Sequence, residues 1–305
     1  MPFQFDHLHT LTTLVDEGTF EATARRLHVT ASAVSQRIRA MEQRAGRVLV
    51  QRTNPVEPTE AGDAVLRYAR QVLLLDQEVL SELRLGEDEH RHQVPLAVNA
   101  DSLASWFLEA LAALPADLGA VFEIHREDEE HTTGLLRSGR VMAAVTSTPD
   151  AVQGCSVEGL GVMRYQAVCA PDFAERHGIH GPEDLVDAPV VDFDRKDDLQ
   201  DRFLRDLTGR GSSGPRHHVP SSEGFARAVL LGLGWGAVPE LQCAEDLENG
   251  RLLAIAPDHP VLVRLFWQRW NLRSPLLDEV TERIRAGAAR HLSPMSRPRG
   301  TGARG

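Results

Sequence analysis

Cysteine is scarce in this 305-residue sequence, and it contains no long apolar run. The three cysteines, Cys155, Cys169 and Cys243, lie far apart and form no CxxC pair, which argues against a disulfide framework or a zinc knuckle. No segment reaches the roughly 18–20 consecutive apolar residues of a membrane-spanning helix. The N-terminal segment "MPFQFDHLHT" has no basic region leading into an apolar core. We therefore expect a cytoplasmic protein with no secretory signal and no membrane partner.

Short catalytic motifs are also missing from the sequence. No GxSxG, HExxH or P-loop pattern occurs. The glycines of "LGLGWGAVPE" follow a helix-like run rather than a strand, which is the wrong order for a dinucleotide fingerprint. The "RHH" of Arg216–His218 has no second ligand group at metal-binding spacing. The sequence therefore predicts that the protein is not an enzyme and uses no metal and no cofactor.

Charge is distributed unevenly along the chain. The formal net charge of the whole sequence is −11, whereas the segment from Arg25 to Arg52 holds seven arginines against one acid, Glu42, a local charge of +6. Such an asymmetry indicates that one segment meets a polyanion while the remainder has another task.

The basic segment reads as two short helices joined by a tight turn. Thr19 is a suitable N-cap for the first, Thr30 or Ser32 for the second, and Gly46 ends the second. One face of the second helix is apolar, with Val34, Ile38, Met41 and Ala45. The opposite face carries only hydroxyl, amide and guanidinium groups, on Ser32, Ser35, Gln36, Arg39 and Gln43. These groups suit phosphates and base edges in the major groove, so the pattern is typical of a helix-turn-helix.

The residues that follow predict a wing beside the second helix. Residues 48–50 can pair as a short strand, and Arg52 and Thr53 precede a proline-bearing return. We expect Arg37, Arg47 and Arg52 to contact phosphate, although a salt bridge to Glu57 or Glu60 is an alternative for Arg52. The complete set of expected DNA contacts is Thr30, Ser32, Ala33, Ser35, Gln36, Arg37, Arg39, Arg47, Arg52 and Thr53.

Residues 20–62, "FEATARRLHVTASAVSQRIRAMEQRAGRVLVQRTNPVEPTEAG", resemble the winged helix-turn-helix of the LysR-type transcriptional regulators. The matching features are the spacing of Ala24 and Leu27, the "AVSQRIRAME" helix, Leu49 with Arg52, and the closing "PTEAG". Ala31 departs from the pattern, because many members have glutamine there. The resemblance implies a regulator that binds double-stranded promoter DNA and contacts RNA polymerase.

A long helix with a heptad-like apolar stripe is predicted after the wing. The stripe consists of Val65, Tyr68, Val72, Leu75 and Val79. In the resembled family this helix packs against a partner's copy, which implies a homodimer or homotetramer. A helix that packs only within its own chain is the alternative. The polar residues 86–95 are expected to form a hinge.

From Val94 onward, strand-like and helix-like segments alternate, which predicts an α/β fold with mostly buried strands. This half resembles the periplasmic-binding-protein-like effector domain of LysR-type regulators, in which two crossover strands join two subdomains. We place the crossovers near Met163–Cys169 and Val261–Gln268. The expected parts are a winged helix-turn-helix (1–60), a linker helix and hinge (61–92), an effector domain (93–295, with subdomain I at 93–164 and 268–295 and subdomain II at 165–267) and a disordered tail (296–305).

Polar residues at strand ends and helix starts predict a ligand site between the two subdomains. Ser102 is placed to hold a ligand carboxylate at a helix start, or only to cap that helix. Asp101, Asp194 and Glu223 suit an ammonium or guanidinium group, so a basic amino acid fits the set. The expected effector-binding residues are Asn99, Asp101, Ser102, Thr146, Ser147, Asp192, Asp194, Ser221, Ser222 and Glu223.

Three segments of this half resemble the ArgP/LysG branch of the family, which senses lysine and arginine and regulates their export. They are "VPLAVNADSLASWFLEAL", "AAVTSTPDAVQGC" and "APVVDFDRKDDLQDRFL". The resemblance implies a transcriptional activator with lysine or arginine as effector. Two alternatives remain open: a LysR-type regulator or repressor of another metabolite, and an architectural DNA-binding protein without a ligand.

Overall fold

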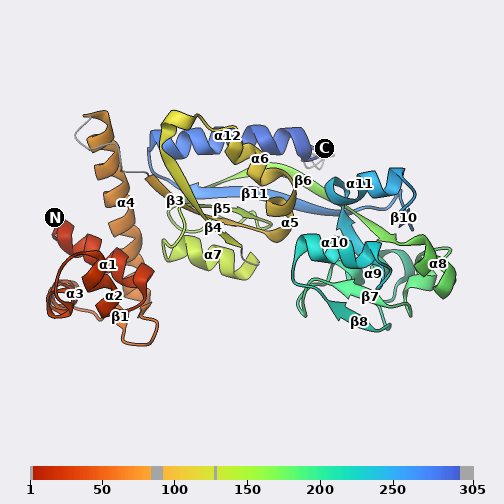
Figure 1. Ribbon diagram of the computed structural model, residues 1–305, viewed down its shortest axis with the longest axis horizontal. Helices are drawn as coiled ribbons and strands as arrows, with labels where there is room; N and C mark the ends of the chain where they lie inside the picture. The colour runs from red at the N-terminus through yellow and green to blue at the C-terminus, as the bar shows by residue number, and fades with distance from the viewer. Residues whose placement is uncertain (1–2, 84–91, 127–128, 296–305) are drawn as a thin grey trace, which may run out of the picture.

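A computed structural model describes residues 3–83, 92–126 and 129–295 of the chain. Figure 1 shows a small helical unit at the N-terminus, one long helix, and a larger α/β part that is drawn out into two lobes. The two-part α/β fold predicted from the sequence is confirmed. Most of the expected hinge and the whole expected tail, residues 296–305, lie outside the described residues.

The N-terminal unit consists of three helices, and residues expected from the sequence cap the second and the third. The helices are α1 (Phe5–Glu17), α2 (Phe20–Arg26) and α3 (Ala31–Ala45). The Thr19 hydroxyl accepts a hydrogen bond from the Ala22 N–H, and the Thr30 hydroxyl accepts one from the Ala33 N–H, as N-caps do. Gly46 ends α3 in the left-handed conformation that glycine tolerates, with φ at 64°.

A two-stranded wing follows α3 and is shorter than predicted. Strand β1 (Val50–Gln51) pairs antiparallel with β2 (Glu57–Pro58). The expected strand over residues 48–50 therefore begins two residues late. Leu49 is fully buried in the helical core, and its N–H is held by the Glu42 carboxylate at 3.0 Å, whereas the Val48 side chain stands in solvent. The Leu49 N–H is thus taken up by Glu42, although the Leu49 carbonyl still accepts a hydrogen bond from the Thr59 N–H at 2.9 Å.

Helix α4 (Glu60–Glu82) contributes to two hydrophobic cores. Near its start, Leu66 and Ala69 are buried in the core of the helical unit, while Leu74 is buried in the core of the large sheet. The predicted stripe is divided accordingly. Its first three members are half-buried against the helical unit, whereas Leu75 and Val79 are 39% and 53% exposed.

Arginines on α4 also attach this helix to the α/β part of the chain. Arg70 pairs with Asp16 of α1 and donates a second hydrogen bond to the Gly139 carbonyl at 2.6 Å. Arg67 donates to the Gln153 carbonyl at 3.2 Å. Gly139 has φ at 73°, and a Cβ atom there would lie 2.6 Å from the Arg67 Cα. The helix backbone can approach this loop so closely because Gly139 has no side chain.

One seven-stranded sheet organises the α/β part, with the order β10-β6-β11-β5-β3-β4 and β9 paired to β6. Strand β3 is parallel to both β4 and β5, and β11 is antiparallel to β5 and β6. The strands are β3 (His92–Val98), β4 (Ala120–Arg126), β5 (Ala143–Thr146), β6 (Cys155–Cys169), β9 (Gly236–Pro239), β10 (Leu253–Ala254) and β11 (Val261–Trp270). The two longest, β6 and β11, run side by side from the first lobe into the second (Figure 1).

Helices cover both faces of the sheet in the first lobe. Helix α12 and the run α5–α6 lie on one face, and α7 lies on the other (Figure 1). The bounds are α5 (Ala100–Ser102), a π-helical turn (Leu103–Phe107), α6 (Leu108–Ala112), a 3₁₀ turn (Ala116–Leu118), α7 (Glu129–Arg137) and α12 (Pro275–His291). The core of this lobe contains Trp106, Phe107, Trp267 and Trp270, each at most 1% exposed.

The second lobe has its own core around Phe173, Leu185, Phe203 and Trp235. Its remaining elements are α8 (Pro171–His177), a 3₁₀ turn (Pro182–Leu185), β7 (Val190–Asp192), α9 (Leu199–Thr208), β8 (Arg216–His218), α10 (Ser222–Leu230) and α11 (Glu240–Glu248). We call the first lobe subdomain I and the second subdomain II. Among the described helices, none is both long enough and apolar enough to cross a membrane.

Candidate functional site

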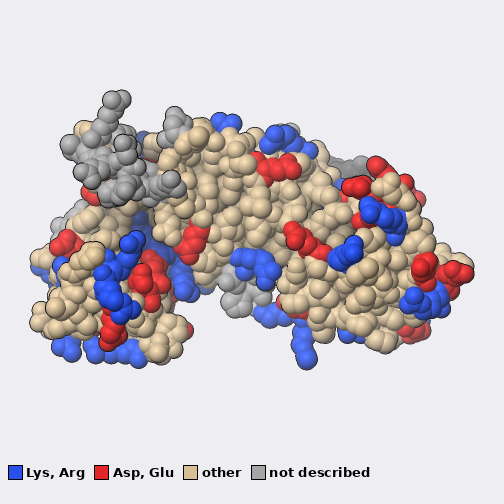
Figure 2. Space-filling model, in the orientation of Figure 1, with Lys and Arg blue, Asp and Glu red and all other residues tan. Residues whose placement is uncertain are grey.

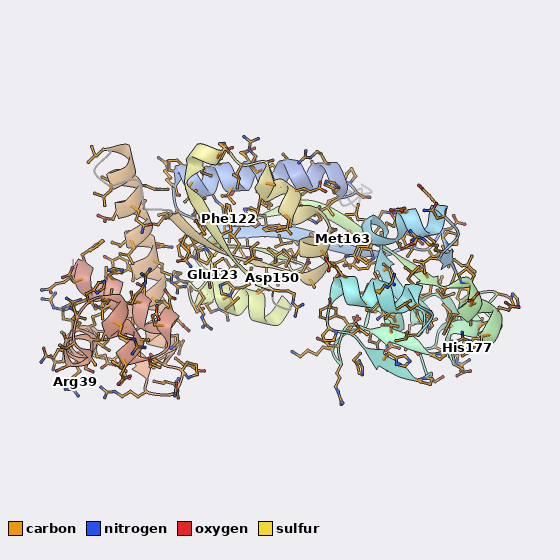
Figure 3. The ribbon with its side chains drawn as sticks, in the orientation of Figure 1. Arg39, Phe122, Glu123, Asp150, Met163 and His177 are labelled. Carbon is orange, nitrogen blue, oxygen red and sulfur yellow. The ribbon has the colours of Figure 1, made fainter. Side chains whose placement is uncertain are left out.

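The polar face of α3 is presented to solvent because the opposite face is anchored. Val34, Ile38 and Met41 are at most 1% exposed, which fixes the rotation of the helix. On the outer side Ser32, Gln36, Arg39 and Gln43 are exposed, and Ser35 is half-buried. Arg39 lies at the outer edge of the helical unit (Figure 3). Arginine side chains also line the lower edge of this unit in the space-filling view (Figure 2). A helix with this exposure can enter a major groove.

A surface hollow of ≈ 620 Å³ lies between the polar face of α3 and the wing. It brings together six of the expected DNA contacts, namely Ser32, Ser35, Gln36, Arg39, Arg52 and Thr53. The Arg52 guanidinium lies 5.8 Å from the centre of the Phe20 ring. No ion pair joins Arg52 to Glu57 or Glu60 in the part of the chain that the structure describes, so the alternative partners are not engaged there.

Arg37 has an orientation that the sequence did not predict. One guanidinium nitrogen donates to the Thr10 hydroxyl at 3.0 Å, and another lies 3.8 Å from the Asp6 carboxylate. Arg37 is next to the buried Ile38 and so lies beside the contact between α3 and α1. Its side chain packs against α1 instead of projecting outward beside Arg39. Arg47 is exposed, while the Ala33 N–H is committed to the Thr30 cap.

The start of α5 holds the most enclosed of the expected effector residues. Asn99 caps this helix, with its side-chain oxygen accepting a hydrogen bond from the Ser102 N–H at 2.8 Å. The reading of Ser102 as the cap is therefore wrong. Ser102 is fully buried, and its hydroxyl has no hydrogen-bond partner among the described residues.

Asp101 connects the two subdomains. One carboxylate oxygen accepts a hydrogen bond from the Tyr165 hydroxyl of β6 at 2.7 Å, and the other accepts one from the Ser222 hydroxyl of α10 at 2.5 Å. The Ser222 oxygen in turn accepts a hydrogen bond from the Gln242 side-chain amide of α11 at 2.7 Å. Burial raises the pKa of the Asp101 carboxyl, although its two hydrogen bonds act in the opposite direction. Burial and the neighbouring Asp101 charge also raise the pKa of Tyr165 well above its ordinary value.

Thr146 belongs to a structural contact rather than to this junction. The Gln268 side-chain amide donates to the Thr146 hydroxyl at 3.3 Å and to the Asp150 carbonyl at 3.0 Å, and its oxygen accepts from the Val152 N–H at 3.0 Å. The buried Gln268 thus holds the loop after β5 in place. Ser147 in this loop is half-buried.

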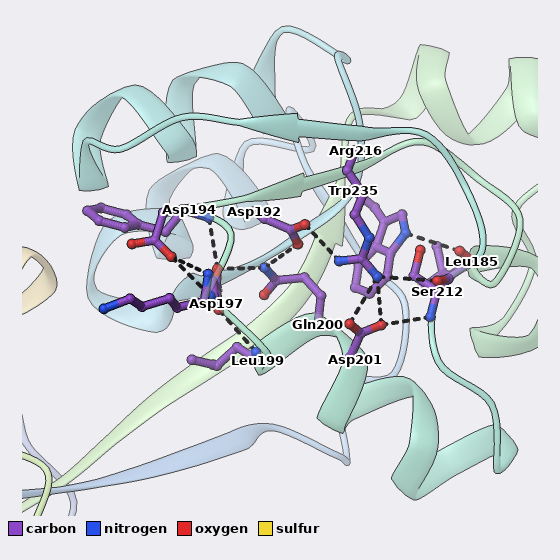
Figure 4. Close-up of polar contacts among 12 residues, drawn as sticks. Leu185, Asp192, Asp194, Asp197, Leu199, Gln200, Asp201, Ser212, Arg216 and Trp235 are labelled. Carbon is purple, nitrogen blue, oxygen red and sulfur yellow. Dashed lines mark hydrogen bonds and ion pairs between the residues drawn. The ribbon is translucent and has the colours of Figure 1, made fainter. Parts of the chain in front are cut away.

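Asp192 is also committed within its own subdomain (Figure 4). It is 1% exposed, and its carboxylate lies 2.7 Å from Arg216 and accepts from the Gln200 amide at 3.0 Å. Arg216 also binds both Asp201 oxygens at 2.9 Å. Burial opposes ionisation of Asp201, but hydrogen bonds from the Ser212 N–H and from Arg216 outweigh it and lower its pKa. The expected orientation of Asp192 toward a ligand is therefore corrected, because its charge is already paired.

Three further candidates shape loops or face solvent. The Asp194 carboxylate accepts from the N–H groups of Lys196 and Asp197 and so forms a turn. Ser221 is the N-cap of α10, with its hydroxyl accepting from the Gly224 N–H at 3.2 Å. Glu223 is exposed.

The structure thus brings Asp101 and Ser222 together, next to Ser102 and the capping residue Asn99. Tyr165 and Gln242 belong to the same network and were not predicted. Tyr165 lies in a segment that reads as a buried strand, where an aromatic ring suggests only core packing. A possible signal is that a buried phenol hydroxyl usually requires a hydrogen-bond partner. Within residues 3–83, 92–126 and 129–295, no three His, Cys, Asp or Glu side chains are grouped to hold a metal ion.

Comparison with protein families gives two matches that together span most of the chain. Residues 5–63 match the family model described as bacterial regulatory helix-turn-helix protein, lysR family. Residues 76–289 match the LysR substrate binding domain.

Similar proteins cover nearly the full length of the chain. The lysine export transcriptional regulatory protein LysG of Corynebacterium efficiens is 45% identical over 285 residues, which cover 91% of this chain and 95% of that protein. The HTH-type transcriptional regulator ArgP of Pseudomonas fluorescens strain Pf-5 is 38% identical and covers 97% of this chain and 100% of its own length.

Solved structures of similar proteins have the same arrangement of parts. The crystal structure of ArgP from Mycobacterium tuberculosis has a TM-score of 0.85 at 40% identity, covering 95% of this chain and 98% of that one. Full-length LysG from Corynebacterium glutamicum with bound effector Arg has a TM-score of 0.77 at 37% identity, covering 96% and 100%.

Proposed function

We propose a function from the premise that this chain belongs to the LysR family of bacterial transcriptional regulators. The protein is a sensor of lysine or arginine that controls the export of basic amino acids. The observation that carries the proposal is its identity of about 40% to LysG and ArgP proteins over nearly the whole chain, one of them solved with bound Arg. A DNA-binding regulator acts where the chromosome lies, so the proposed location is the cytoplasm.

The proposed DNA contacts are divided between reading and positioning. Ser32, Ser35, Gln36 and Arg39 are proposed to reach base edges from the exposed face of α3. The proposed contacts to the DNA phosphates are made by Thr30, Arg47, Arg52 and Thr53. Arg37 and the Ala33 N–H are left out, because both are engaged within the protein. Phosphate contacts position the protein without reading sequence, which suits residues at the edges of α3 and on the wing.

The proposed regulatory mechanism couples the subdomain junction to the arrangement of DNA-binding units. A dimer or tetramer places its α3 helices in successive major grooves, and a basic amino acid bound at the junction shifts the equilibrium between two arrangements. A ligand can do this only through its differential affinity for the two. The proposed outcome is activation through altered DNA bending and contact with RNA polymerase.

Calorimetric titration of the full-length protein against all twenty amino acids tests the effector. We expect lysine or arginine to bind. If neither amino acid binds, the proposed effector is wrong. A DNase footprint on the promoter with and without the bound amino acid tests the mechanism. A footprint that no amino acid changes would favour an architectural role, and a response to an unrelated metabolite would favour another branch of the family.

A further inference from the structure

Two aspartates at the heart of the effector domain differ in how their charge is balanced. Asp192 has the Arg216 guanidinium at 2.7 Å. Asp101 has only the hydroxyls of Tyr165 and Ser222, and no cationic side chain pairs with it among the residues that the structure describes. A desolvated carboxylate without a counter-charge is energetically costly, and a cation brought to it is correspondingly stabilised.

The surroundings of Asp101 contain further unused hydrogen-bonding capacity. The Ser102 hydroxyl, on the adjacent residue, is fully buried and lacks a partner within the described chain. The side-chain oxygen of Gln242, whose amide holds Ser222, is likewise buried and unpaired in the described structure. Donors and acceptors without partners at a buried junction indicate groups that a ligand is expected to satisfy. Asp101 as a whole residue keeps partial solvent exposure.

Starting from the function proposed above, we infer that Asp101 exchanges partners when the effector binds. The α-ammonium group of the amino acid replaces the Ser222 hydroxyl on the Asp101 carboxylate, while the Tyr165 hydroxyl stays. Ser102, one residue further on, donates its free hydroxyl to the α-carboxylate. The two ligand groups share one carbon atom, so consecutive residues suit them. Ammonium-to-carboxylate hydrogen bonds are stronger than those from a neutral hydroxyl, which drives the exchange.

The exchange links binding of the ligand to the contact between the two subdomains. The Asp101–Ser222 hydrogen bond joins residues 121 positions apart in the sequence, on α5 of subdomain I and α10 of subdomain II. When the ligand takes the place of Ser222, this direct link is replaced by contacts through the ligand. The Ser222 hydroxyl therefore competes with the α-ammonium of the effector for the Asp101 carboxylate.

Variants of the full-length protein that change the two partners should have opposite effects on lysine affinity. Asp101→Asn keeps the size of the side chain and removes its charge, so lysine and arginine should bind roughly 10–100-fold more weakly, as expected for loss of a charge-assisted hydrogen bond. Ser222→Ala removes the competing donor and should tighten binding about 3–10-fold. Glu175→Gln, an equivalent change at an exposed residue of α8, should leave the affinity unchanged. Circular dichroism melts establish that each variant is folded.

A ligand comparison separates the α-ammonium from the side-chain ammonium. 6-Aminohexanoic acid is lysine without its α-ammonium, and norleucine is lysine without its side-chain ammonium. The preference for lysine over 6-aminohexanoic acid should vanish in Asp101→Asn, whereas the preference over norleucine should persist. The reverse pattern of preferences would overturn the inference. A Ser222→Ala variant that binds lysine no more tightly than the unaltered protein would overturn it as well. Failure of the unaltered protein to bind lysine or arginine would instead reject the proposed function.

Discussion

Residues of the same type perform different tasks in this protein because of the partners that the fold gives them. Asp192 is the last residue of β7 and Asp101 lies just after β3, and both were expected to meet a ligand. Arg216 neutralises the first, whereas the second is bound only by hydroxyls. The sequence places both carboxylates correctly at strand ends, but the pairing across β7 and β8 that occupies Asp192 depends on tertiary structure.

Removal of the Arg216 charge should destabilise subdomain II. Arg216→Met leaves Asp192, 1% exposed, without its counter-charge, and we expect a loss of about 3 kcal/mol in the free energy of unfolding. Arg202→Met, which breaks an ion pair exposed on both sides, should cost no more than about 0.5 kcal/mol. Urea denaturation measures both values, and equal effects would contradict the structural role of Arg216.

The same network gives a pH dependence. Because the pKa of Asp201 is lowered in the folded state, its ionisation stabilises the fold fully above the ordinary value of 3.8. That contribution is lost as the pH falls below 3.8 through the lower pKa of the folded state. In urea denaturation over this acidic range, Arg216→Met should show a weaker dependence on pH than the unaltered protein.

The three thiols should be unreactive in the folded protein. Burial raises the pKa of Cys155 and Cys169 to about 11 and that of Cys243 to about 12. At pH 8 the thiolate fraction is therefore at least about 100-fold below that of an unperturbed cysteine, and the thiolate is the reactive form. Reaction with Ellman's reagent should be slow in buffer and should reach three equivalents promptly in denaturant. Rapid reaction of one thiol in buffer would contradict this expectation.

At the scale of single elements, α3 is largely predictable from sequence, whereas α4 is not. The cap at Thr30, the stop at Gly46 and the apolar stripe of α3 are local features, and the structure has all three. The stripe of α4 is equally clear, but the sequence does not show that its first half packs onto the helical unit while Leu74 enters a different core. Arg37 escaped prediction for the same reason, since its partners lie on another helix.

Arg39 on α3 should read a base if it enters the major groove. Arg39→Ala is then expected to cost about 1–3 kcal/mol of specific binding and to relax the preference at one operator position. Arg47→Ala, by contrast, should weaken binding to all sequences alike and reduce the salt dependence by about one charge. Fluorescence anisotropy with an operator and its single-base variants distinguishes the two. A uniform loss for Arg39→Ala would identify it as a phosphate contact.

The close approach of α4 to the Gly139 loop should not tolerate a methyl group. A Cβ at Gly139 would lie 2.6 Å from the Arg67 Cα, so Gly139→Ala adds a clash with helix backbone to the strain of a positive φ. Gly209 has the same φ of 73° and open space around it, so Gly209→Ala measures the strain alone. We expect Gly139→Ala to lower the free energy of unfolding by about 1–3 kcal/mol more than Gly209→Ala. Equal losses would show that α4 moves aside freely.

At the scale of the whole molecule, the exposed end of α4 is expected to bind a second copy of the chain. Val79 is 53% exposed in the outer half of the stripe, and Val79→Asp should weaken dimerisation roughly 10–100-fold. Leu231→Asp, at a leucine that is 61% exposed on subdomain II, serves as the control and should leave the dimer intact. Sedimentation equilibrium measures both, and an unaltered dimer in Val79→Asp would place the interface elsewhere.

The whole-molecule architecture was predictable because it repeats a known family pattern, but the junction was not. Alternation of strand-like and helix-like segments indicates an α/β part, and the family resemblance implies its two subdomains. The hydrogen bond between Asp101 and Ser222 spans 121 residues, and no local pattern in the sequence encodes such a contact. Tyr165 and Gln242 join this network because the fold places β6 and α11 beside the Asp101–Ser222 pair.

The paired strands β6 and β11 have a consequence for how this protein can be engineered. The chain enters subdomain II once, along β6, and leaves it once, along β11, and these two strands are bonded to each other in antiparallel register. Subdomain II is therefore topologically an insert within subdomain I, with both of its connections held side by side. Such an insert can be exchanged between relatives as a cassette with two neighbouring splice points. Grafted chimeras should keep Asp101, Ser102 and the operator that α3 recognises, while the groups that subdomain II presents at the junction change.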